Sequence, residues 1–162
     1  MEKPVEFQIE KSAFDDLSLT AQRHESVAFF DENKLSGQER LFYRVWASRL
    51  LQTGVFEPGQ VMQRKSQVPS YGFVVVSGNV AVEDDDGHYL LGAGTVIGLA
   101  EGLCELPSRY NYVAHDAVSC KLIPIDVACR EIGRINSGLK GICRFTVQRI
   151  LGERATCPDF MR

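Results

Sequence analysis

Hydrophobic and polar residues follow two different periods along this chain. From Ser36 to about residue 52, apolar residues recur three or four positions apart, and Ser36 with Glu39 has the Ser-x-x-Glu spacing of a helix start. From Val55 the pattern alternates residue by residue, which is typical of strands with one buried face. After Asp126 the helical spacing returns. The pattern therefore predicts a helix, a β-rich centre and C-terminal helices.

Glycine residues divide the β-rich centre into short strands. Glycine accepts the positive φ of tight corners, so this punctuation indicates a small antiparallel roll. The acidic run 83–87 ends in an Asp-Gly step and predicts a hairpin with a solvated tip, because it lacks the spaced ligands of a calcium loop. The predicted strands are Val61–Lys65, Gly72–Val76, Asn79–Val82, His88–Leu91, Val96–Ile97, Tyr110–Ala114 and Ser119–Pro124.

The two ends of the chain have less distinctive patterns. Residues 1–35 are expected to form an arm or a short helix with no assigned role. Asp126 is expected to cap a helix that ends near Arg134, and Asn136 or Ser137 to begin a longer helix. We expect one domain over 36–162, with the roll at about 55–125 and the C-terminal helices at 126–153. The apolar face of the long helix carries Leu139, Ile142, Cys143, Thr146, Ile150 and Leu151.

Composition narrows the class of protein. The 162 residues carry 18 basic and 21 acidic side chains. Proteins that bind nucleic acid usually have a basic surplus, so nucleic acid is not expected as the main partner. No apolar run is long enough for a membrane span and no secretory signal is visible, which predicts a cytoplasmic protein. The five cysteines include no Cys-x-x-Cys pair. They are expected to be reduced and to pack as small apolar residues, without a zinc site.

Three motifs in the β-rich centre, taken in order, resemble a known family. They are Phe56-x-Pro58-Gly59-x-x-Met62, Tyr71-x-Phe73-Val74-Val75-x-Ser77-Gly78-x-Val80-x-Val82 and Gly92-x-Gly94-x-x-x-Gly98. Over roughly residues 40–152 the chain looks like the cyclic-nucleotide-binding domain of bacterial regulators of the catabolite-activator and fumarate-nitrate-regulator type. The resemblance implies a mainly β fold: an eight-stranded, jelly-roll-like antiparallel roll with flanking helices.

In that family a phosphate-binding cassette follows the last glycine motif. The amides of a short helix face the cyclic phosphate, a glutamate accepts from the ribose hydroxyl, and an arginine pairs with the phosphate. Here Leu99 stands at the glutamate position, and Glu101, on another side of the helix, is not expected to replace it. Ser108 stands at the arginine position. The resemblance implies a ligand site at Gly98, Leu99, Ala100, Ser108, Arg109, Tyr110 and Asn111.

Arg109 is the main open question in this cassette. It comes one position late, and a one-residue shift in a strand reverses the face unless a bulge intervenes. Tyr110 and Tyr112 are bulkier than the family's residues. An inward-pointing Arg109 should meet an anion, because an unpaired buried charge is costly; the alternative is an exposed side chain. If Arg109 serves only a ligand, Arg109→Ala should leave the melting temperature of the free protein nearly unchanged.

Three functions remain open from the sequence. In the first, the cassette binds cyclic AMP or another cyclic nucleotide. In the second, it binds a different small ligand. In the third, the roll binds no ligand and serves as an interaction or dimerisation module. We expect a non-catalytic module that forms a homodimer through residues 137–152, and, where it binds a ligand, a regulatory module that signals through its C-terminal helix. A protein partner is a further candidate, whereas a DNA partner and a cofactor are not expected. The histidines His24, His88 and His115 lack the spacing of a metal enzyme of the cupin type.

Overall fold

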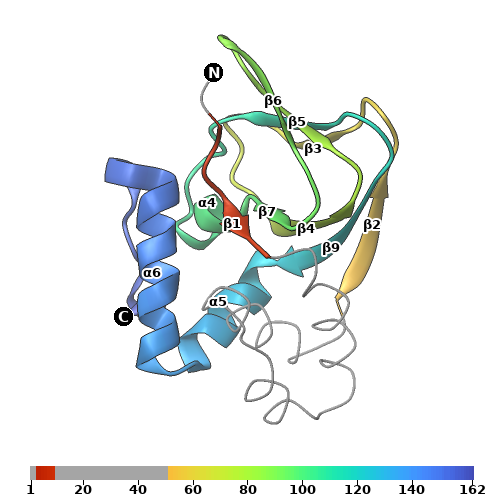
Figure 1. Ribbon diagram of the computed structural model, residues 1–162. Coiled ribbons are helices and arrows are strands. Elements are labelled where there is room, and N and C mark those ends of the chain that lie inside the picture. The colour runs from red at the N-terminus through yellow and green to blue at the C-terminus, as the bar shows by residue number, and fades with distance from the viewer. Residues whose placement is uncertain (1–2, 10–50) are drawn as a thin grey trace.

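The computed structural model describes residues 3–9 and 51–162 of the chain. In this part of the chain, the strands form two antiparallel sheets that face each other as a roll (Figure 1). The first sheet has the order β1-β7-β4-β9-β2, and the second has the order β3-β8-β5-β6. The strands are β1 (Phe7–Gln8), β2 (Gln52–Phe56), β3 (Val61–Gln63), β4 (Tyr71–Ser77), β5 (Val80–Asp84), β6 (Gly87–Leu91), β7 (Thr95–Ile97), β8 (Asn111–Ala114) and β9 (Val118–Pro124).

The seven strands predicted from the alternating pattern are all present, with ends displaced by at most two residues. The fold class, mainly β with flanking helices, is confirmed. Two strands were not predicted: β2, whose first residue Gln52 lies where the helical pattern ends, and β1 in the N-terminal arm. The helix expected from Ser36 lies outside the described residues.

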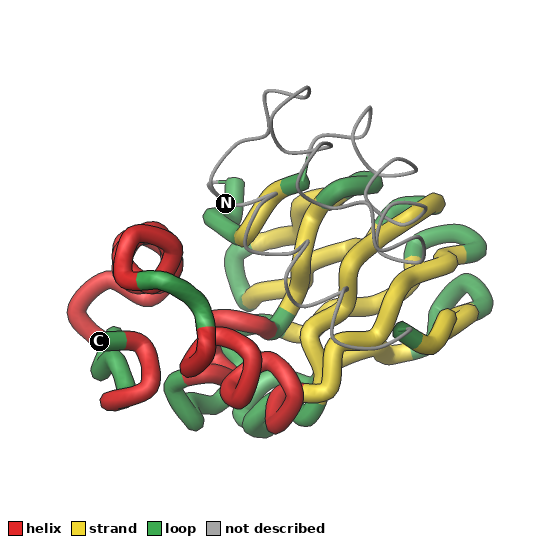
Figure 2. Tube along the Cα trace, turned by 90° about the horizontal axis from the view of Figure 1, so that it is seen from below, coloured by secondary structure: helices red, strands yellow, loops and turns green. Residues whose placement is uncertain are grey.

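Helices gather at one end of the roll, as Figure 2 shows. They are the short α4 (Leu99–Leu103), α5 (Ile125–Arg134) and α6 (Ser137–Leu151), followed by the 3₁₀ turns Gly152–Arg154 and Asp159–Met161. The predicted start of α6 is confirmed, because the Asn136 side chain accepts from the amide of Leu139 at 2.9 Å. The predicted Asp126 cap is wrong: the extended backbone of Pro124 precedes the helix, and α5 begins at Ile125.

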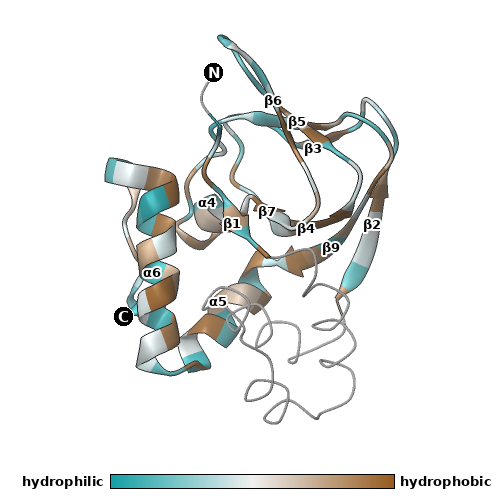
Figure 3. Cartoon of the chain, in the orientation of Figure 1, coloured by the Kyte–Doolittle hydropathy of each residue, from teal (hydrophilic) through white to brown (hydrophobic). Residues whose placement is uncertain are grey.

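Two apolar clusters form the core. One fills the roll between the sheets, and the other joins the first sheet to the helices (Figure 3). The α6 residues Cys143, Val147 and Ile150 are buried in this second cluster. The chain itself therefore covers much of the face assigned to a dimer contact, while Phe145 on the outer face is 62% exposed. The homodimer through residues 137–152 stays a prediction.

The acidic hairpin lies where the sequence predicts it. Asp84 pairs with Gly87, so Asp85 and Asp86 form the turn, and the hydrophilic tip of β5–β6 projects from the roll (Figure 3). Residues 3–9 and 51–162 contain no group of three or more His, Cys, Asp or Glu side chains that could hold a metal ion. In the same part of the chain, no helix has the length and apolarity to cross a bilayer.

Gly94 is the point at which the N-terminal strand attaches to the roll. The Ile9 amide donates to the Gly94 carbonyl at 2.8 Å, next to the register Phe7↔Val96. Gly94 has φ +93°, and a Cβ there would lie 2.2 Å from the Ile9 carbonyl oxygen. The approach of β1 therefore requires glycine at this position.

Gly94→Ala tests this requirement, with Gly59→Ala as the matched control. Gly59 has a similar φ of +89°, but a Cβ at that position would have no atom within 4 Å. The positive φ costs each variant about 1–2 kcal/mol. We expect Gly94→Ala to lose about 1–3 kcal/mol more, because the methyl group collides with β1. Equal free energies of unfolding in urea would contradict the described docking of β1.

Candidate functional site

Gly98, with φ +81°, is the N-cap residue immediately before the short helix α4. A side chain at this position would meet the Tyr71 carbonyl oxygen at 3.2 Å and the Pro69 ring at 3.3 Å. Leu99 and Ala100 follow with 1% and 0% exposure and belong to the core. They therefore hold α4 against the first sheet and present no side chain to a ligand.

Arg109 lies in the bend before β8, so the strand alternation that would turn it outward does not apply. Its Nε donates to Glu101 Oε1 of α4 at 2.9 Å, and its Nη1 donates to the Ile150 carbonyl in the last turn of α6 at 2.8 Å. The Arg109 side chain is 20% exposed and Glu101 is 1% exposed. The expectation that an inward Arg109 meets an anion is confirmed, and the anion is part of the chain.

Glu6 brings a second carboxyl group to Arg109 from the residue before β1. The Tyr112 hydroxyl donates to Glu6 Oε1 at 2.6 Å, and the same oxygen lies 3.7 Å from Arg109 Nη2. Glu6 Oε2, Glu101 Oε2 and Arg109 Nη2 are buried without a hydrogen-bond partner among the described residues. We call Glu6, Glu101, Arg109 and Tyr112 the carboxylate–arginine cluster; its polar groups are only partly satisfied.

The electrostatics of this cluster favour a neutral Glu6. Burial and the neighbouring Glu101 raise the pKa of Glu6 from 4.5 to about 8, against the opposing effects of Tyr112 and Arg109. Burial, followed by Glu6 and Glu101, holds the pKa of Tyr112 well above its usual range. Although burial lowers the pKa of Arg109, Glu101 and Glu6 outweigh it and raise the pKa. Glu6 therefore carries a proton at neutral pH, beside the Arg109–Glu101 salt bridge.

The other residues of the implied ligand site have structural partners. Ser108 exchanges backbone hydrogen bonds with Ser66 and Gln67, and its hydroxyl donates to the Tyr110 carbonyl at 2.9 Å. Asn111 Oδ1 accepts from the Lys65 amide at 2.8 Å. Both residues therefore anchor the 64–67 loop.

The ring of Tyr110 lies between two members of the cluster. Its centroid is 5.3 Å from Arg109 Cζ, and it meets the ring of Tyr112 edge to face at 6.2 Å. Of the seven implied site residues, the structure brings only Arg109 and Tyr110 to the cluster through their side chains.

Sequence reasoning missed Glu6 and Tyr112 as partners and set Glu101 aside. One usable signal was the single carboxylate of Glu101 inside the apolar stretch 96–103, since such a residue is rarely buried without a counter-ion. For Glu6 no local signal exists, because its burial depends on pairing between β1 and β7, about 90 positions away.

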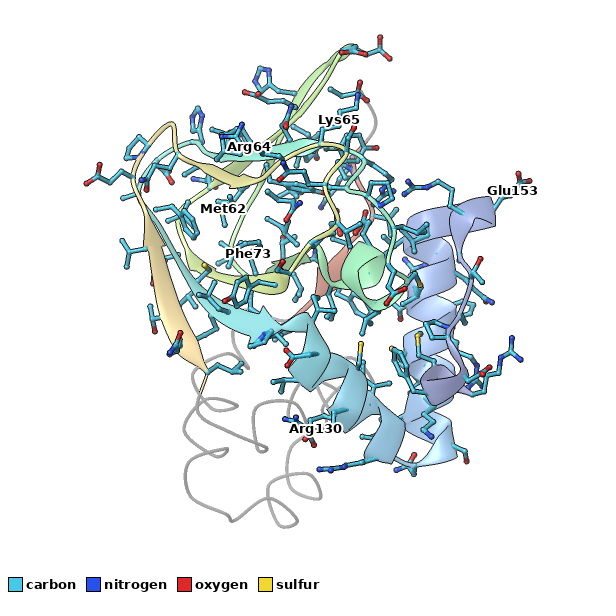
Figure 4. All side chains as sticks on the ribbon, turned by 180° about the vertical axis from the view of Figure 1, so that it is seen from behind. Met62, Arg64, Lys65, Phe73, Arg130 and Glu153 are labelled. Atoms are coloured by element: carbon cyan, nitrogen blue, oxygen red, sulfur yellow. The ribbon has the colours of Figure 1, made fainter. Side chains whose placement is uncertain are left out.

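A separate pocket of about 310 Å³ opens between β3 and β4. Met62 and Phe73 form its buried part, and Arg64 lies at its rim (Figure 4). The remaining lining residues are Val61, Gln63, Gln67, Val68, Ser70 and Tyr71. No member of the carboxylate–arginine cluster lines this pocket.

Comparison with known proteins identifies the fold. No family model matches the chain, and no curated protein matches it. A solved structure from a cyclic-GMP-dependent signalling pathway that regulates bacterial phytopathogenesis has a TM-score of 0.56 and 18% identity, over 72% of this chain and 93% of that one. The PKAR CBD2 domain with bound Sp-2Cl-cAMPS has a TM-score of 0.53 and 12% identity, over 94% and 97%.

A third similar structure is an enzyme: a variant of the cAMP-binding acyltransferase from Mycobacterium smegmatis. Its TM-score is 0.51 and its identity 22%, over 85% of this chain and 41% of the acyltransferase. The chain thus spans less than half the length of that enzyme. These likenesses show that the chain has the fold of cyclic-nucleotide-binding domains. A fold hosts many functions, so they do not by themselves assign one.

Glu6 should make the stability of the protein depend on pH. Its pKa is about 8 in the folded chain against an ordinary value of 4.5 in the unfolded chain, so the folded state binds more protons between these values. The free energy of unfolding should therefore fall by a few kcal/mol as pH rises from about 5 to 8. Urea titrations of wild type and Glu6→Gln check this. A slope of equal size in both proteins would show that another group causes it.

The structure also changes the expected effect of Arg109→Ala. Removing the guanidinium leaves Glu101 buried without a cation, so we expect a loss of about 3 kcal/mol rather than an unchanged melting temperature. In the double variant with Glu101→Gln, the loss should be smaller than the sum of the single losses by at least about 1 kcal/mol. Urea unfolding of all four proteins gives this cycle, and additive losses would argue against the pair.

Proposed function

We propose that this chain is a non-catalytic regulatory module that binds a small anionic ligand, with a cyclic nucleotide such as cyclic AMP as the leading candidate, at Arg109. The fold supports the ligand class, since the similar structures named above include domains whose names state cyclic AMP binding or cyclic GMP signalling. The chemistry of a guanidinium at the end of a short helix supports an anion.

A single observation carries this proposal: Arg109 is bonded to both α4 and the end of α6. An anion that takes Nε or Nη1 must release Glu101 or the Ile150 carbonyl. Binding at Arg109 would therefore change the free-energy difference between conformations in which α6 is bonded to Arg109 and conformations in which it is released. Such a difference is required for a ligand to transmit a signal. Arg109 Nη2 is buried without a hydrogen-bond partner among the described residues, so it has donor capacity left for an anion that reaches it.

A second candidate function is a ligand-free interaction module. The observation that favours it is apolar packing at two positions that the family leaves smaller or polar: Tyr112 is 0% exposed inside the roll, and Leu99 is 1% exposed in the cluster between the first sheet and the helices. In this alternative the carboxylate–arginine cluster replaces the ligand as the connection between α4 and α6. A protein partner or a second copy of the chain would then bind to α6 in its fixed position.

Isothermal calorimetry with cyclic AMP and cyclic GMP tests the first proposal. The variant is Arg109→Lys, which keeps a cation beside Glu101 but loses the planar donors. We expect it to bind at least about tenfold more weakly than wild type, or about 1.4 kcal/mol. The control is Arg130→Lys on α5, half exposed and remote from the roll (Figure 4). It should bind like wild type.

The outcomes separate the two candidates. Stabilisation by about 2.7 kcal/mol at a ligand concentration of 100 Kd would accompany true binding. Loss of hydrogen-exchange protection near the C-terminal end of α6 on binding would support transmission through Ile150. No heat with either nucleotide, together with no stabilisation, would favour the ligand-free module. Equal binding by Arg109→Lys would place the ligand elsewhere, for which the pocket beside Met62 is the next site.

A further inference from the structure

The pocket beside Met62 has no part in the proposed site at Arg109. Its volume of about 310 Å³ lies at the lower end of the range of sites that bind small molecules. Met62 of β3 is 7% exposed and Phe73 of β4 is 6% exposed, and together they form the apolar bottom of the pocket. Phe56 meets the ring of Phe73 edge to face at 5.9 Å and so helps to fix its orientation.

Exposed apolar side chains gather at the mouth of this pocket. Seven large hydrophobic residues are exposed among those that the structure describes, and three of them line the pocket: Val61 at 38%, Val68 at 50% and Tyr71 at 42%. The ring of Tyr71 lies 6.4 Å from that of Phe73, so the aromatic surface continues from the buried part to the mouth. Single exposed apolar residues are common, whereas a group of them around a concave site is typical of ligand binding.

Gln63 brings an available polar group to the pocket. This residue is 8% exposed, and its Nε2 donates to the carbonyls of Arg64 and Gln67 at 3.2 and 3.1 Å. Its Oε1 accepts no hydrogen bond from any residue that the structure describes. Polar atoms of nearly buried side chains usually have a partner, so this oxygen can accept from an N–H or O–H group of a ligand.

The charge around the pocket is positive. Arg64 is the one charged residue among those that line it. Neither Arg64 nor the adjacent Lys65, both exposed, forms a salt bridge within the described part of the chain (Figure 4). A guanidinium without a counter-ion binds anions through charge-assisted hydrogen bonds, so a ligand with a negative group fits this rim.

The turn that carries Arg64 is fixed by the rest of the fold. Ser66 in this turn has φ +70°, which non-glycine residues rarely adopt. Its amide donates to the Ser108 carbonyl at 2.9 Å, and the Lys65 amide donates to Asn111 Oδ1 at 2.8 Å. The backbone on this side of the pocket is therefore held in place without a ligand, which lowers the entropic cost of binding.

We propose that this pocket is a second ligand site, separate from Arg109, and that it takes a small aromatic molecule with one negative group. The ring of the ligand would lie on Phe73 and Tyr71, where apolar and aromatic contacts are available. Its negative group would bind Arg64, and a donor on the ring would bind Gln63 Oε1. This inference does not depend on the proposed function, because no member of the carboxylate–arginine cluster lines the pocket.

Fluorescence titrations with two matched probes test the proposed chemistry. Anilinonaphthalene sulfonate (ANS) is an aromatic anion, and N-phenylnaphthylamine has the same rings without the sulfonate. Wild type should bind ANS saturably. Arg64→Gln should bind ANS at least about tenfold more weakly and the neutral probe with unchanged affinity, because only the charged hydrogen bond is lost. Arg130→Gln, a half-exposed arginine on α5, is the control and should bind both probes like wild type.

A second pair of variants tests the location. Val68→Glu places a carboxylate at the pocket and should weaken the binding of both probes, whereas Val55→Glu, on β2 and outside the pocket, should not. Both valines are exposed, so urea unfolding should show little change in stability. Three results would each overturn the site: no saturable binding of ANS to wild type, equal ANS affinity of Arg64→Gln and wild type, or equal ANS affinity of the two valine variants.

Competition with cyclic AMP separates this site from the proposed function. ANS should stay bound at saturating cyclic AMP, because the pocket and the carboxylate–arginine cluster share no residue. Displacement of ANS would show that the nucleotide itself occupies the pocket and would overturn a second site. If neither cyclic AMP nor cyclic GMP binds, the proposed function fails, while the probe titrations of the Arg64 and Val68 variants still decide whether the pocket binds aromatic anions.

Discussion

The buried ion pair between Arg109 and Glu101 constrains the rest of the site. A charge in this position requires a partner of opposite sign, and the chain supplies Glu101 from α4 and the Ile150 carbonyl from α6. The neighbouring segments α4 and the bend before β8 are therefore joined to the more distant α6 at one guanidinium. Burial, followed by the neighbouring Glu101, raises the pKa of Glu6 to about 8, so that the second carboxyl group beside the single guanidinium is mostly protonated at neutral pH.

The sequence predicts the roll well because alternation and glycine punctuation are local signals. The seven strands from Val61 to Pro124 and the start of α6 at Asn136 follow from patterns of a few residues. The site is less predictable, because its geometry depends on long-range pairing. Arg109 escapes the strand alternation only because β8 begins two residues later, at Asn111, and no pattern in the sequence fixes that boundary.

The cluster also shows how the chain departs from the family that it resembles. The family leaves room for a ligand, whereas Tyr112 here fills part of the roll and places its hydroxyl on Glu6. Ser108 and Asn111, expected at the ligand, instead fix the 64–67 loop. Polar side chains at the implied ligand positions thus have structural partners, which sequence spacing alone does not reveal.

The position of β1 has a consequence for solubility. It lies at one end of the first sheet, and β2 lies at the other end among the described strands. Without β1, the backbone groups of Thr95–Ile97 would form an open sheet edge flanked by the apolar residues Val96 and Ile97. Such an edge can pair with another chain, and this pairing is a common start of aggregation. A short strand that covers an apolar edge is one way to protect it, so removal of residues 3–9 is expected to favour aggregation.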